Sequence, residues 1–178
     1  MTLPKDYAWL AKEPGPKMLV EALALYGTRE KAGAADNPII LEWAKECGIA
    51  GYSHDSIAWC GLAMAVAAKR AGWDFKPNGN ALWALNWARW GDPVKRPMLG
   101  DILTFKRPGG GHVALYVGED ATAFHCLGGN QGDAVSIVRI VRSRLYAARR
   151  AQWKISEPEN VRVVSLSASG AALSKNEA

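Results

Sequence analysis

The stretch that decides the fold is ILTFKRPGGGHVALYVGEDATAFHCL, residues 102–127. It contains three short segments rich in β-branched and aromatic residues, at 102–105, 112–117 and 123–127. The intervening RPGGG and GED sequences are typical of hairpin turns. A further segment of the same kind follows at 135–141. Consecutive strands joined by short turns predict an antiparallel sheet.

The residues before this stretch have helical rather than strand periodicity. Asn37-Pro38 is a helix cap followed by proline in the first turn, Ser56 is the expected cap of the next helix, and Asn80 that of a fourth. The predicted helices are 16–26, 38–47, 57–71 and 81–90. Because helices come first and strands follow, the order predicts an α+β fold, with N-terminal helices packed on an antiparallel β-sheet of about five strands, rather than a βαβ fold.

Composition restricts the class of protein. The 178 residues are 49% hydrophobic and 22% charged, which excludes disordered, collagen-like and heptad-repeat chains. No apolar run approaches a membrane span. The opening residues lack a basic region and an apolar core, so we expect no signal peptide. We divide the chain into an irregular lead-in (1–15), one domain (16–157) and a flexible tail (158–178).

Cys60 is the most informative residue, because it lies at the start of the third predicted helix. A helix N-terminus stabilises a thiolate through unpaired N–H groups and the helix dipole, which lowers the thiol pKa. His112 opens a strand beside three glycines, where it can serve a nucleophile as general base. Taken singly, a buried structural cysteine and a satisfied strand-end histidine are the more common fates. Their combination favours a thiol hydrolase.

A third polar group is needed to orient the histidine. His125 lies one hairpin after His112, and Asn130 and Gln131 follow the same strand, so the pattern leaves all three open. No CxxC or HxxxH spacing is present, so we expect no metal ion and no other cofactor.

Two surface features have a structural and a binding interpretation. Trp83, Trp87 and Trp90 have helical spacing, which more often marks a core face than a ligand platform. The arginine-rich stretch 139–150 is by default a solvated face. With a net charge of +5, an anionic polymer is the alternative partner.

Six motifs in order resemble the CHAP and NlpC/P60 group of papain-like cysteine peptidases and amidases. They are Asn37-Pro38-Ile39-Ile40, Trp59-Cys60, Trp87-Ala88-Arg89-Trp90-Gly91, Gly100-Asp101-Ile102, Gly111-His112-Val113 and Gly128-Gly129-Asn130-Gln131. The resemblance spans about residues 16–155 and is closest to the phage-type, CHAP-like branch. The sequence departs from the pattern at Gly61 and at His54-Asp55, and neither departure removes a catalytic atom.

The resemblance implies a papain-like fold and a peptidoglycan hydrolase of the endolysin type, which cleaves amide bonds of the bacterial cell wall. It implies Cys60 as nucleophile, His112 as base and Asn130 as third residue, with His125 as the alternative. We expect Trp59, Trp87, Gly111 and Gln131 to contact the substrate.

The expected partner is bacterial peptidoglycan and not nucleic acid. We expect a monomer that stays in the host cytoplasm until a holin gives it access to the wall, or that travels in the virion. A bacterial toxin of the same fold and a non-catalytic wall-binding or virion assembly module are the alternatives.

Overall fold

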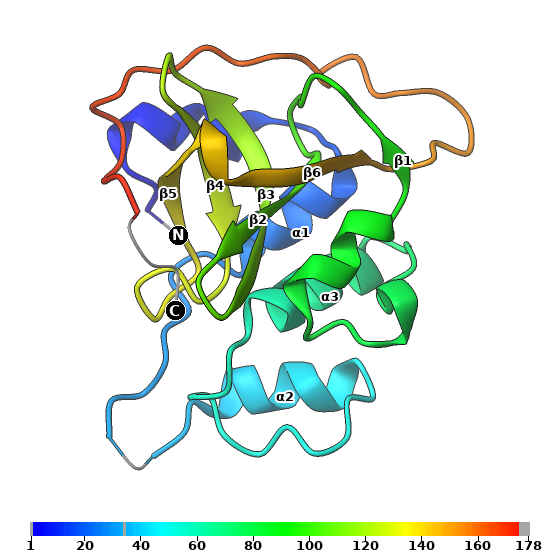
Figure 1. Cartoon of the computed structure of the whole chain (residues 1–178), viewed down its shortest axis with the longest axis vertical. Coiled ribbons are helices and arrows are strands. Elements are labelled where there is room, and N and C mark those ends of the chain that lie inside the picture. Colours follow the sequence, from blue (N-terminus) through cyan, green and yellow to red (C-terminus); the bar gives the residue numbers. More distant parts are fainter. Residues whose placement is uncertain (1, 34, 175–178) are drawn as a thin grey trace.

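The computed structural model describes residues 2–33 and 35–174 as an α+β fold (Figure 1). The α-helices are α1 (Lys17–Ala24), α2 (Pro38–Glu46) and α3 (Cys60–Arg70). Short 3-10 helices, labelled η, are η1 (Lys5–Lys12), η2 (Pro77–Gly79), η3 (Ala84–Arg89) and η4 (Arg142–Arg144). The strands are β1 (Asp92–Pro93), β2 (Ile102–Arg107), β3 (Gly110–Glu119), β4 (Ala123–Gly128), β5 (Ser136–Val141) and β6 (Leu145–Arg150).

The sheet is antiparallel, with strand order β1-β6-β2-β3-β4-β5. The predicted hairpins are confirmed. Arg107 pairs with Gly110 across the first turn, and β3 returns into β4 through residues 120–122. Both turns are short, so β2, β3 and β4 are neighbours in sequence as well as in space.

Side chains alternate between the two faces of the sheet. Val113, Leu115 and Leu127 join the main core, which α1 and α3 cover. Ala114 and Tyr116 join a smaller cluster with Leu103, Phe105, Phe124, Cys126, Ile140 and Ala148.

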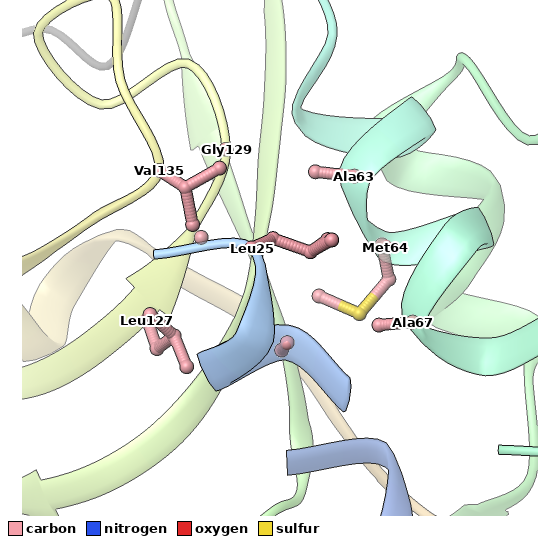
Figure 2. A pocket seen from close by; sticks show the side chains of 9 residues that line it. Leu25, Ala63, Met64, Ala67, Leu127, Gly129 and Val135 are labelled. Atoms are coloured by element: carbon pink, nitrogen blue, oxygen red, sulfur yellow. The ribbon is translucent and has the colours of Figure 1, made fainter. Parts of the chain in front are cut away.

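The helices pack tightly on the main face. Figure 2 shows the remaining gap between α1, α3 and β4, where Leu25, Met64 and Leu127 converge. Its volume is about 10 Å³, and apolar residues and two glycines line it. A void this small and apolar leaves no room for a ligand.

The first two helices confirm the sequence prediction. The α1 helix lies within the expected range and is followed by Gly27 in the left-handed region. Asn37 caps α2 by accepting a hydrogen bond from the Ile39 backbone N–H at 2.9 Å, with Pro38 in the first turn.

The start of the third helix is a correction, because α3 begins at Cys60 rather than at Ile57 and Ser56 does not cap it. The preceding loop is held by hydrogen bonds to another segment of the chain. The buried Asp55 carboxylate accepts the backbone N–H groups of Lys31 and Asn37, at 2.9 and 2.8 Å. These bonds hold residues around 55 in a turn, so the helix can begin only after Trp59.

The expected fourth helix, 81–90, is also a correction. Only Ala84–Arg89 is helical, as the 3-10 helix η3. Asn80 accepts the Leu82 N–H at 3.1 Å, but this bond closes a turn and no α-helix follows. The three tryptophans therefore do not form one stripe. Trp87 is fully buried and Trp83 is 68% exposed.

The arginine-rich stretch is not simply a solvated face. Residues 145–150 form β6, which inserts between β1 and β2. Arg150 makes two hydrogen bonds to the buried Asp101 carboxylate, at 2.9 and 2.8 Å. Arg139 pairs with Asp120 at 2.7 Å. These arginines neutralise carboxylates of the domain itself.

Both flanking segments are more ordered than expected. In the lead-in, η1 buries Tyr7 and Leu10 in the main core. The C-terminal segment runs along the upper edge of the sheet in Figure 1 and exchanges backbone hydrogen bonds with Glu119 and Arg139. Within the predicted tail, residues 158–174 are therefore hydrogen-bonded to the sheet at these positions, and residues 175–178 lie outside the described part. Within residues 2–33 and 35–174, no helix is long and apolar enough to cross a membrane.

The cap of α2 gives a stability prediction. Replacing Asn37 by Ala removes the acceptor for the Ile39 N–H, which should lower the free energy of unfolding by about 1–2 kcal/mol. Asn37→Ser, which restores a capping oxygen, should recover most of the loss. Urea titration followed by circular dichroism measures both, and equal stability of wild type and Asn37→Ala would contradict the capping role.

Candidate functional site

Cys60 is the first residue of α3 and lies against the start of β3. The backbone N–H of Val113 points at its sulfur, as do N–H groups of the first helical turn at Cys60 and Gly61. Val113 directly follows His112 in β3. The structure therefore brings the two predicted residues to one place, although they are 52 positions apart in the sequence (112 − 60 = 52).

The environment of the thiol corrects one expectation. Burial raises the pKa of Cys60 above its ordinary value, whereas the N–H groups and the charge of Arg107 oppose this rise. We expected the helix N-terminus to lower the thiol pKa. In the closed site desolvation is stronger, because only 5% of Cys60 is exposed. Ionisation of this thiol therefore depends on a proton acceptor nearby.

His112 is buried, and Gln131 holds its ring. The distance from His112 Nε2 to Gln131 Oε1 is 3.0 Å. The Gln131 amide nitrogen donates to the backbone carbonyls of Cys126 and Ser136, at 3.2 and 2.6 Å. These two bonds fix the amide so that only its oxygen faces the imidazole. In the neutral ring His112 Nε2 therefore carries the proton, and the lone pair lies on Nδ1.

Gln131 thus takes the position expected for Asn130. Asn130 itself has a positive φ of 54° and is buried, and its side-chain oxygen has no hydrogen-bond partner among the described residues. The glycine-rich turn directs the amide one position later than expected. The residue pattern did not decide whether Asn130 or Gln131 orients the histidine, and Asn130 was expected from the motif resemblance.

His125 belongs to a different cluster. Its Nε2 donates to Asp120 at 2.9 Å, and its Nδ1 accepts from the Tyr7 hydroxyl at 2.5 Å. The Asp120 carboxylate also accepts a hydrogen bond from the Arg139 guanidinium. With both ring nitrogens occupied in a cluster with η1 and β5, His125 does not orient His112.

A pocket of about 390 Å³ opens above the thiol. Its walls are Ala58 with Cys60, residues 82–85 and the β2–β3 hairpin, which contributes Arg107 and the three glycines 109–111. Of the four residues expected to contact substrate, Gly111 lines this pocket. Gln131 holds His112 instead.

Trp59 and Trp87 are fully buried, so they cannot contact a ligand. The Trp59 indole donates to Glu30 at 2.5 Å, and the Trp87 indole donates to the Ala81 carbonyl at 3.0 Å. The aromatic side chain that lines the pocket is Trp83. Sequence reasoning placed it on a helical stripe and gave no signal for Arg107.

The glycine after Cys60 has a structural reason. A Cβ at Gly61 would lie 2.1 Å from the Ala81 carbonyl oxygen and 2.7 Å from that of Leu82. The segment that forms one wall of the pocket therefore rests directly on the helix backbone. The departure from the family pattern at Gly61 fits this close approach.

The other two cysteines, Cys47 and Cys126, are buried, and neither they nor Cys60 form a disulfide within the described part of the chain. Among the described residues, no group of three or more His, Cys, Asp or Glu side chains is arranged to hold a metal ion. No protein-family model matches the chain, and no curated protein sequence is significantly similar to it.

The His125 cluster predicts a pH dependence of stability. Burial lowers the pKa of His125, and Asp120 only partly opposes this. As the pH falls below about 6.5, the unfolded imidazole takes up a proton before the folded one does, so the fold loses stability. The loss is at most about 1.4 kcal/mol per pH unit for one proton.

Thermal melting of wild type and His125→Gln between about pH 7.5 and 5.5 measures this effect, in a range centred on the ordinary histidine pKa. The melting temperature of wild type should fall more steeply than that of the variant. Parallel curves would show that His125 is not the titrating group.

Proposed function

We propose that this protein is a cysteine-dependent amide hydrolase of the papain-like kind that acts on bacterial peptidoglycan. The single observation that carries the proposal is the Cys60 thiol at the start of α3, against the backbone N–H that follows His112. A nucleophile, a candidate base and a group that orients the base lie on three separate elements. A merely structural cysteine needs neither of the other two.

In the proposed mechanism, His112 Nδ1 takes the thiol proton as the sulfur attacks the amide carbonyl carbon. Negative charge then develops on the carbonyl oxygen, and the N–H groups at the first turn of α3 are suited to stabilise it. The imidazolium gives its proton to the leaving amine. Water then releases the acyl group, and the thiol returns. Throughout the reaction His112 Nε2–H donates to the Gln131 oxygen, so Nδ1 stays available to accept and return the proton.

Peptidoglycan is proposed as the substrate because the six motifs resemble wall-degrading enzymes and because the net charge of +5 suits an anionic envelope. The endolysin setting, with access through a holin or delivery in the virion, is part of the same proposal.

Replacing Cys60 by Ser tests the nucleophile. Serine is nearly isosteric but is not ionised near neutral pH, so wall lysis should fall to less than about a tenth of wild type. Cys47→Ser and Cys126→Ser are matched controls, because both remove a buried thiol outside the pocket. Turbidity loss of permeabilised cells reports activity, and a thermal melt reports folding. A folded but inactive control would show that the wrong cysteine was chosen.

Gln131 is a positioning residue, and its test separates orientation from packing. Gln131→Ala should lower kcat about tenfold or more, because the His112 ring loses the acceptor that fixes its tautomer. Gln131→Glu keeps an acceptor and should shift the acid limb of the pH profile upward, because a carboxylate favours the charged imidazole.

Asn130→Gly is the control for this test, since glycine tolerates the positive φ and should keep most activity. If Asn130→Gly were inactive but folded while Gln131→Ala stayed active, Asn130 would be the third residue after all.

A further inference from the structure

The pocket above Cys60 has an uneven distribution of charge. Ala58, Leu82, Trp83, Ala84 and Leu85 make two of its walls apolar. On the hairpin wall Arg107 carries the only charge among the described residues that line the pocket. The site therefore presents one cation within a largely apolar surface.

Arg107 lines the same pocket as the Cys60 thiol. Its Nε donates to the Gly111 carbonyl at 3.3 Å, which holds the side chain over the hairpin. Its charge also acts on the Cys60 thiol in the direction that favours the thiolate. A guanidinium in this position can serve the nucleophile and also attract an anionic group of a substrate.

The hairpin beneath Arg107 leaves space for such a group. A Cβ at Gly109 or at Gly110 would meet nothing within 4 Å, so the backbone there is open. At Gly111 a Cβ would instead clash with Leu85 at 2.5 Å, which sets the width of the pocket. Arg107 is half-buried, so water screens its charge less than that of a fully exposed arginine.

We propose that Arg107 is a specificity-determining residue that binds a carboxylate of the substrate close to the scissile amide. A planar guanidinium matches a carboxylate through paired hydrogen bonds. The preferred substrate is therefore a peptide amide with a free carboxylate on or next to the residue that acylates Cys60. This inference rests on the proposed function for the amide, but the anion preference of the pocket does not.

Alkylation of Cys60 tests the pocket without any hydrolysis. Iodoacetate and iodoacetamide both form a bond from sulfur to carbon as iodide leaves, but only iodoacetate carries a carboxylate. Peptide mapping measures the rate at which each reagent alkylates Cys60. The ratio of the iodoacetate rate to the iodoacetamide rate should be about fivefold lower in Arg107→Gln than in wild type. This factor is the upper range for one partly exposed charge pair.

Two variants keep this test decisive. Arg107→Lys retains the charge and should keep most of the ratio even if the hairpin loosens. Arg89→Gln removes an exposed arginine that lines a separate pocket without a cysteine, and it should leave the ratio unchanged. An unchanged ratio in Arg107→Gln, or an equal fall in Arg89→Gln, would overturn the proposal.

A second arm identifies the carboxylate. Purified sacculi are compared with the same sacculi after their carboxylates have been converted to amides with carbodiimide and ammonia. Wild type should digest the unmodified sacculi several-fold faster, and Arg107→Gln should digest both at the same rate. If wild type digested unmodified and amidated sacculi at the same rate, the enzyme would not recognise a substrate carboxylate, and the specificity role of Arg107 would be overturned.

The two arms separate the failures. If wild type showed the expected iodoacetate preference but digested no sacculi, peptidoglycan would be refuted as the substrate and the anion site at Arg107 would still stand. Digestion that requires Cys60 but shows no anion preference would refute only the role of Arg107.

Discussion

The first turn of α3 is held so close to its neighbours that two positions around it have room only for glycine. A Cβ at Gly61 would overlap the Ala81 carbonyl, and a Cβ at Gly129 would lie 2.5 Å from Ala63 and 2.8 Å from the Trp59 ring. These contacts bring the start of α3 against both the 81–82 segment and the turn after β4. The short Cys60 side chain can therefore reach the backbone of β3. The positions of the Cys60 thiol and of the 82–85 wall of the pocket depend on this close approach.

Two buried polar side chains near this contact, Asp55 and Gln131, are satisfied by the domain itself. Asp55 accepts hydrogen bonds from the backbone N–H groups of Lys31 and Asn37. Gln131 donates to two backbone carbonyls while its oxygen meets His112. Buried polar groups are costly unless they are paired, so each of these residues fixes a local conformation. The result is an imidazole held by Gln131 in the residue that precedes Val113, whose backbone N–H meets the desolvated Cys60 thiol.

A second buried cluster of paired polar groups lies at the opposite end of the sheet. His125 lies between Tyr7 and Asp120, and Arg139 neutralises the carboxylate. In the sequence His125 looked equivalent to the other candidates for the third residue, because hairpin spacing does not reveal which partners a strand residue meets. The 3-10 helix that carries Tyr7 lies over 100 positions away, so no local pattern could have indicated it.

The sequence by itself determined that helices precede strands, the end of α1 before Gly27, the Asn37 cap of α2, the hairpins around 108–109 and 120–122, and the candidates Cys60 and His112. Those features follow from local periodicity, turn residues and side-chain chemistry, which act over a few neighbouring positions. Only the tertiary structure decided that α3 starts at Cys60, that Gln131 rather than Asn130 holds the imidazole, and that Trp83 and Arg107 line the pocket while Trp59 and Trp87 lie in the core. Each of these depends on backbone groups from distant segments that compete for the same hydrogen bonds and the same space.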